Sequence, residues 1–158
     1  MLIGDAELAV ELHRRLRQAG GRSLVLASPG ELPNATDEDV DAIVSRSIDP
    51  ASLHDARIRE VEAIIALSRV PQMNDLICEL WEPLVGAESC YRWDRDVSEA
   101  SGDYESIWRE LPGPERVMAA LQEGRSRIEV VDLDSHWQER NAGPRLHPLL
   151  LLDKGRIS

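Results

Sequence analysis

The sequence predicts an α/β fold, a doubly wound parallel sheet with helices on both of its faces. Short apolar segments of strand length alternate with amphipathic segments of helix length over the first 95 residues. The segment from Met1 to Ser28 reads as strand, turn, helix and strand, which is one βαβ unit. We expect the other strands to assemble on this unit in the order 3-2-1-4-5, with a small C-terminal α+β extension.

The helix of this first unit is expected from about Asp5 to Ala19. Its apolar residues recur at i, i+3 and i+4 and share one face: Leu8, Ala9, Leu12, Leu16 and Ala19. Acidic residues stand in its first turn and arginines in its last turns, as the helix dipole favours. Gly20 ends the helix, and Ser23–Ala27 is an apolar run typical of a strand covered on both faces.

The turn before this helix carries part of a glycine motif that binds dinucleotide phosphates. The pattern G-x-G-x-x-G falls on residues 4–9, where Gly4 allows the tight turn but Ala6 replaces the glycine that lets backbone approach a pyrophosphate. Asp5 adds a negative charge there. The acid that would hold a ribose is missing, because the second strand ends in Ser28 and Pro29. We therefore expect NAD and NADH to bind weakly or not at all, whereas adenine mononucleotides are less strongly excluded.

Length and composition favour one domain, or one domain with a small appendage, in a reduced cytosolic setting. The chain has 158 residues and a formal net charge of −11, which argues against nucleic acid and anionic lipid as partners. Cys78 and Cys90 have no metal or redox spacing and are expected in the core. No apolar run approaches the roughly 20 residues of a spanning helix, and no secretory signal precedes the fold. Met1 falls almost inside the first strand, which suggests a domain cut from a longer chain.

Further strands are predicted at Ala42–Ser45, Ala63–Leu67 and Ser89–Trp93. Between the first two, a helix is expected to begin at Asp49 and Pro50, because Asp caps helices and Pro is tolerated at the first helical position. Its inward residues would be Leu53, Ala56 and Ile58. The next helix is expected to end at Gly86, with these residues on its inner face: Met73, Leu76, Ile77, Leu80 and Leu84.

The C-terminal third changes character. We divide the chain into residues 1–95, the half with the degenerate glycine motif, and residues 96–158, an extension packed with it as one domain. The acid-rich segment from Asp94 to Glu105 is interpreted as a mobile, solvated loop. Helices are then expected around Tyr104–Leu111 and at Pro114–Glu123, and strands at Arg127–Leu133 and Leu146–Leu152.

Three polar residues are candidates for a site at the carboxyl ends of the strands, where open α/β sheets bind ligands. Asp49 and Asn74 would lie there, although Asp49 also suits a helix cap and Asn74 also suits a partner for loop backbone. Ser68 could offer its hydroxyl to a phosphate or to a turn amide. His13 is expected on the solvated side of the first helix. The four histidines lack metal-like spacing and no nucleophile motif occurs, so neither an enzyme nor a metal centre is expected.

The stretch Asp41–Pro50, followed by Val61–Ser68 and Asn74, resembles the RCK (regulator of potassium conductance) type of Rossmann domain. That family carries a Gly-Asp pair after its third strand and a Thr-x-x-Asp-x-x-Asn-like stretch after its fourth. Asp49, Ser68 and Asn74 are the counterparts here. The continuation through Leu111–Gly124 and a terminal apolar strand is similar to the cytosolic tails of monovalent cation:proton antiporters.

The resemblance implies a cytosolic regulatory domain at the inner face of the cell membrane, paired as a homodimer and attached to the membrane domain of an antiporter. It implies a ligand site near six positions: Gly4, Ala6, Ser28, Asp49, Ser68 and Asn74. Two other hypotheses remain open. One is a small or degenerate NAD(P)-dependent oxidoreductase, and the other is a structural dimerisation module without a ligand.

A tryptophan favours the dimer on physical grounds. If Leu80 faces the sheet, Trp81 is rotated about 100° away from it on the same helix. A large apolar side chain that points off the core is a common interface anchor. The alternative is that the C-terminal third folds back over Trp81 through Leu149 and Leu151.

Overall fold

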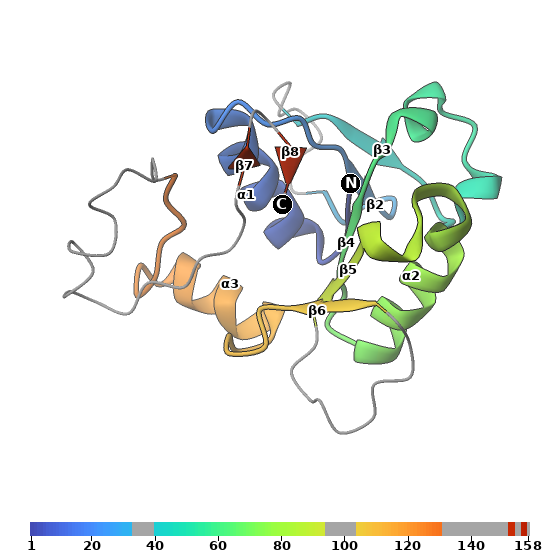
Figure 1. The fold of residues 1–158 in the computed structure, drawn as a ribbon. Coiled ribbons are helices and arrows are strands. Elements are labelled where there is room, and N and C mark those ends of the chain that lie inside the picture. Colours follow the sequence, from blue (N-terminus) through green and yellow to red (C-terminus); the bar gives the residue numbers. More distant parts are fainter. Residues whose placement is uncertain (33–39, 94–103, 131–151, 154–155, 158) are drawn as a thin grey trace.

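Six parallel strands form the central sheet of the computed structural model, in the order β3-β2-β1-β4-β5-β6 (Figure 1). The structure describes residues 1–32, 40–93, 104–130, 152–153 and 156–157. The strands of the sheet are β1 (Leu2–Gly4), β2 (Val25–Ala27), β3 (Ala42–Val44), β4 (Ile64–Leu67), β5 (Cys90–Trp93) and β6 (Glu105–Ile107). The α-helices are α1 (Ala6–Gln18), α2 (Pro71–Val85) and α3 (Pro114–Gln122). This is a Rossmann-like α/β fold, and the predicted order 3-2-1-4-5 is confirmed.

The two faces of the sheet are buried under different helices, which makes the fold doubly wound. Side chains alternate along each strand, so Leu2 faces one side and Ile3 the other. The side of Leu2 packs against α1 and Met118 of α3. The side of Ile3 packs against α2, through Trp81 and its neighbours. The sheet therefore lies between two apolar layers, as its unbroken apolar strands indicate.

The sixth strand replaces a predicted helix. The segment Tyr104–Leu111 has apolar residues at helical spacing, but residues Glu105–Ile107 form β6 and pair in parallel with β5. The open edge of β5 offers unpaired backbone groups, and pairing with that edge overrides the local periodicity. Trp108 follows with a positive φ of 55° and packs edge-on against Trp93, with ring centroids 4.9 Å apart.

The link from β3 to β4 also differs from the prediction of one helix after Asp49. Two short 3₁₀ helices occur instead, Pro50–Ser52 and Ala56–Glu60. Two aspartates account for this, because Asp49 accepts from the amide of Ala51 and Asp55 accepts from the amide of Arg57. Each side chain starts a new tight turn, so no single helix spans the segment. Of the three predicted inward residues, Ile58 is buried and Ala56 is exposed.

Helix α2 buries a different face from the predicted one. Its core residues are Asn74, Ile77, Cys78 and Trp81. Of the residues assigned to the inner face, only Ile77 is buried, whereas Met73, Leu76 and Leu84 are 37%, 40% and 44% exposed. Trp81 is fully buried, and its Nε1 donates to the carbonyl oxygen of Ile48 at 2.8 Å. Trp81 is thus a core residue, and its proposed role as an interface anchor is wrong.

His13 is likewise buried rather than solvated. Its Nε2 accepts from the amide of Asp41 at 3.2 Å, so its Nδ1 donates to the hydroxyl of Ser23 at 2.8 Å. The ring ties α1 to the segments that precede β2 and β3. Both cysteines are buried, as predicted, and burial raises the pKa of the Cys78 thiol to about 12 and that of Cys90 to about 11.

Several C-terminal predictions lie outside the described residues. These are the loop at 94–103, most of the predicted strand at Leu146–Leu152 and the two leucines, Leu149 and Leu151. The strand predicted at Arg127–Leu133 is wrong in its described part, because residues 127–130 form neither a strand nor a helix. Helix α3 begins at Pro114 as predicted, and β7 (Leu152–Asp153) pairs with β8 (Arg156–Ile157) in antiparallel fashion. Among the described helices, none combines the length and apolar character needed to cross a bilayer.

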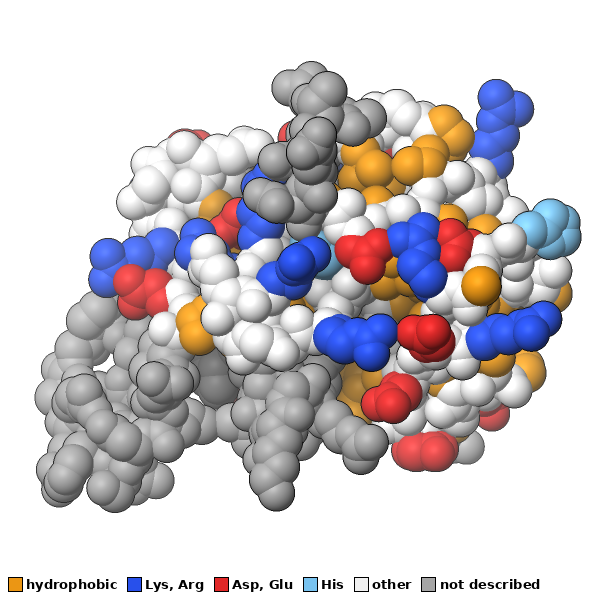
Figure 2. All heavy atoms as spheres, turned by 90° about the horizontal axis from the view of Figure 1, so that it is seen from above, with side chains coloured by type: hydrophobic (Ala, Val, Ile, Leu, Met, Phe, Trp, Pro, Cys, Tyr) orange, Lys and Arg blue, Asp and Glu red, His pale blue; other side chains and the backbone are white. Residues whose placement is uncertain are grey.

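Acidic and basic side chains interleave on the surface. Figure 2 shows Arg and acidic groups side by side on the face seen from above. The ion pairs among the described residues include Arg22 with Glu60 and Arg57 with Asp55. The described part of this face carries no continuous basic patch of the kind that a nucleic acid backbone requires.

Candidate functional site

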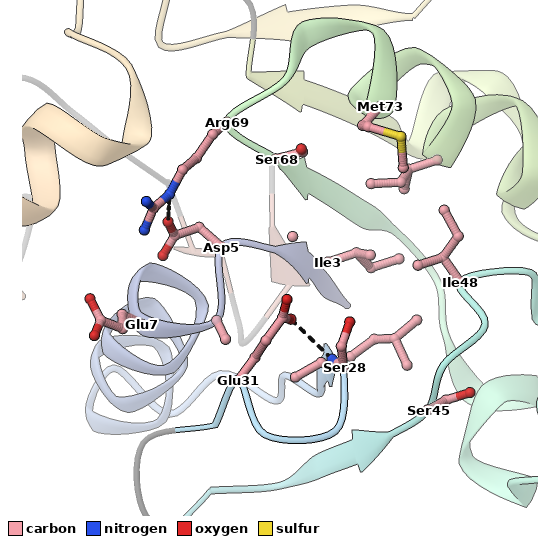
Figure 3. Close-up of a pocket in the computed structure, with 15 residues that line it drawn as sticks. Ile3, Asp5, Glu7, Ser28, Glu31, Ser45, Ile48, Ser68, Arg69 and Met73 are labelled. Carbon is pink, nitrogen blue, oxygen red and sulfur yellow. Dashed lines mark hydrogen bonds and ion pairs between the residues drawn. The ribbon is translucent and has the colours of Figure 1, made fainter.

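A cleft of about 540 Å³ opens at the carboxyl ends of β1, β2, β3 and β4 (Figure 3). This is the point where the strand order reverses from β1 toward β4, at which open α/β sheets bind ligands. Four of the six sequence-predicted residues line it, namely Gly4, Ala6, Ser28 and Ser68. The other two, Asp49 and Asn74, do not line it.

Gly4 sets the shape of the cleft floor. Its φ is +132°, and a Cβ at this position would lie 2.5 Å from both the carbonyl carbon of Leu67 and the amide nitrogen of Ser68. The turn after β1 therefore touches the end of β4, which only glycine permits. Ala6, 7% exposed, follows in the first turn of α1, where the full glycine motif has a glycine.

Asp5 holds that turn in place by two contacts. Its Oδ1 accepts from the amide of Leu8 at 3.1 Å and caps α1, and its Oδ2 accepts from Nε of Arg69 at 2.6 Å. The Asp5 side chain is only 2% exposed, whereas Arg69 is 54% exposed and its pKa is raised by this bond. The pair links the loop after β1 to the loop after β4, at the rim of the cleft.

Glu31 is the site residue that the sequence interpretation missed. It follows Ser28 by three residues, and its Oε2 accepts from the amide of Ser28 at 3.2 Å. A carboxylate thus lies at the end of β2, although the last residues of that strand in the sequence include no acid. The available signal was the turn sequence Ser28-Pro29-Gly30, which brings residue 31 back toward residue 28.

Asn74 supports the cleft from behind. It is 1% exposed, its Oδ1 accepts from the amide of Ser68 at 2.7 Å, and its Nδ2 donates to the carbonyl oxygens of Ser68 and Trp93. The side chain joins the ends of β4 and β5 and fixes the loop that carries Ser68 and Arg69. Asp49 lies apart and caps the 3₁₀ helix Pro50–Ser52, with 2.9 Å from its Oδ1 to the amide of Ala51.

The walls of the cleft differ in character. Figure 3 shows Asp5, Glu7 and Glu31 gathered near the start of α1, with Ile48 and Met73 on the opposite side. Three carboxylates and a single arginine line the cleft. Since Arg69 is engaged by Asp5, the charge that remains is that of Glu7 and Glu31. The cleft has an anionic wall and an apolar wall.

The described residues give this cleft no recognisable catalytic set. Within this part of the chain, no three His, Cys, Asp or Glu side chains are grouped to hold a metal ion. Its hydroxyl groups, from Ser28, Ser45 and Ser68, have no histidine among the lining residues to activate them.

No family model, curated protein or solved structure matches the chain. The fold and the geometry of the cleft are therefore the observations on which a functional proposal rests.

Proposed function

We propose that this chain is the cytosolic regulatory domain of a monovalent cation:proton antiporter. It acts as a homodimer at the inner face of the membrane and responds to a ligand in the cleft. The observation that carries the proposal is a Rossmann-like sheet whose switch-point cleft is open and lined by binding groups while its phosphate motif is degenerate. A binding domain needs such a cleft, whereas a dehydrogenase also needs an intact phosphate loop.

Helix α2 could transmit ligand binding in the cleft to an attached transporter. Met73 and Ile77 line the cleft, and both belong to α2. If α2 can occupy two positions, a ligand that binds better to one of them raises the population of that position. The size of the shift is set by the difference between the ligand's affinities for the two positions. An attached transporter senses the shift if its own contacts with the domain distinguish the same two arrangements.

The same helix supports the homodimer. Met73, Leu76, Leu80 and Leu84 recur at i, i+3, i+7 and i+11, so they form one stripe, about 100° from the buried face of α2. Three of the four are exposed, and none is charged. An apolar, uncharged stripe fits a second copy of itself across a two-fold axis. Met73 belongs to both the stripe and the cleft, which would couple pairing to ligand binding.

The test is proton-coupled cation exchange in everted membrane vesicles. Cells carry the intact gene locus or the same locus without the codons for residues 1–158, and exchange is normalised to the amount of transporter. We expect loss of the segment to change the cation concentration for half-maximal exchange several-fold. Equal exchange in the two preparations, or a locus that encodes no transporter in the same chain or beside it, would overturn the proposal.

A further inference from the structure

We infer that the cleft takes a nucleoside without a phosphate, with Glu31 accepting the two ribose hydroxyls. This inference rests on the proposal that the cleft is the regulatory ligand site, and it names the class of ligand. Three features of the cleft carry it: a carboxylate at the end of β2, an excess of negative charge around the first turn of α1, and an apolar wall opposite.

Glu31 supplies the acceptor for the diol. Its carboxylate is exposed at the end of β2 and is held there by the 3.2 Å bond from the amide of Ser28. An ionised carboxylate accepts and does not donate, so a vicinal diol, which has two hydroxyl donors on adjacent carbons, is a matching partner. A carboxylate in this part of a Rossmann-like sheet suits a ribose.

The charge of the cleft argues against a phosphate. The helix N-terminus that would receive a phosphate already has Asp5 as its cap, and Glu7 lies in the same turn. Asp5 also engages Arg69, the cleft's one cation among the described lining residues. A phosphate placed there would face Asp5, Glu7 and Glu31, and like charges at contact distance disfavour binding.

The opposite wall suits a base. Ile48, Met73 and Ile77 supply apolar side chains for a flat ring. Ser45 and Ser68 accept backbone amides with their Oγ atoms, at 3.0 Å from Ser47 and 3.1 Å from Val70, so their hydroxyl hydrogens remain for acceptors on the base. The cleft volume of about 540 Å³ lies within the range of small-molecule pockets.

The experiment is a calorimetric titration of the 158-residue chain with adenosine, guanosine, 2′-deoxyadenosine, AMP and NADH. We expect one of the two ribonucleosides to bind. Removal of the 2′-hydroxyl should weaken adenosine binding about tenfold, and AMP and NADH should bind at least about tenfold more weakly than adenosine. If guanosine binds instead of adenosine, the same comparison is made between guanosine and 2′-deoxyguanosine, GMP and NADH.

The decisive variant is Glu31→Gln, with Glu60→Gln as its matched control. Glu60 is an exposed acid that pairs with Arg22 and does not line the cleft. Glu31→Gln should weaken the ribonucleoside about tenfold and abolish the preference over its deoxy form, while Glu60→Gln leaves both unchanged. Binding of neither nucleoside, or an undiminished preference in Glu31→Gln, overturns the inference. Tighter binding of AMP or NADH overturns it too, but leaves the proposed function standing, because a ligand then still occupies the cleft.

Discussion

Among single residues, three buried polar side chains fix backbone near the ends of strands and of helix α1. Asn74, His13 and Asp5 are each at most 8% exposed, and each accepts a hydrogen bond from a backbone amide, that of Ser68, Asp41 and Leu8 respectively. The sequence identifies Asn74 as a candidate because it follows a strand, but it does not reveal which backbone groups the side chain reaches. Helical spacing alone predicts a solvated His13, because it does not show that Ser23 and Asp41 lie within hydrogen-bonding distance of its ring.

The α-amino group of Met1 gives a prediction about pH. In a chain that begins at Met1, this amine lies in the interior and donates to the carbonyl oxygen of Ala63 at 2.5 Å. Burial lowers its pKa from 8.0 to about 5, so between these values the unfolded chain holds a proton that the folded chain lacks. The free energy of unfolding should rise from pH 5 to pH 8, by at most about 4 kcal/mol from this group.

Urea unfolding across this pH range provides the measurement. A chain acetylated at Met1 has no ionisable amine and serves as the control, because all its other titratable groups are the same. The unfolding free energy of the chain with the free amine, minus that of the acetylated chain, should rise from pH 5 to pH 8. A difference that is constant with pH would contradict this account of the amine.

Among the helices and strands, those whose sequence pattern fits only one structure could be predicted. Where the pattern fits two structures equally well, tertiary contacts decide which one forms, and the sequence pattern alone does not. Helix α1 has a cap, one apolar stripe and a glycine stop, and it lies where the sequence places it. Helix α2 has apolar residues on two faces. One face includes Met73 and the other includes Trp81, and only packing against the sheet decides that the face of Trp81 is buried. Within the segment predicted as a helix, residues Glu105–Ile107 form a strand because β5 has an open edge with which they pair.

The turn between β1 and α1 gives the sharpest prediction at this scale. Gly4→Ala should lower the free energy of unfolding by about 2–5 kcal/mol, since the new Cβ would meet backbone at 2.5 Å and φ is +132°. Gly20→Ala is the control, because Gly20 also has a positive φ, of +79°, but nothing lies within 4 Å of its Cβ position. It should cost about 1–2 kcal/mol. Equal losses in denaturant titrations of the two variants would refute the close approach of β1 and β4.

At the scale of the whole molecule, the parallel order of the sheet was predictable because strands and helices alternate, and the sixth strand extends it by one. The cleft was only partly predictable. Gly4, Ala6, Ser28 and Ser68 stand beside strand ends in the sequence. Glu31 is signalled only by the turn that precedes it, and the ion pair of Arg69 with Asp5 has no signal in the spacing of the residues.

The apolar stripe of α2 predicts that two copies of the chain pair. We expect sedimentation equilibrium at tens of micromolar to give a dimer, and Leu76→Glu to raise its dissociation constant at least about tenfold, because it places a charge in the uncharged stripe of α2. Val130→Glu makes the same change at a 45% exposed valine outside α2 and should leave the mass unchanged. A monomeric native chain, or a dimer that Leu76→Glu leaves intact, would remove the stripe as an interface.

Cation exchange in everted vesicles measures whether the cleft controls transport. Met73→Trp places a large ring in the cleft, whereas Val130→Trp makes a similar change at a 45% exposed valine that belongs neither to the cleft lining nor to the stripe of α2. We predict that Met73→Trp shifts the cation concentration for half-maximal exchange several-fold and that Val130→Trp leaves it at the native value. Native behaviour of Met73→Trp, or an equal shift in both variants, would contradict control through the cleft.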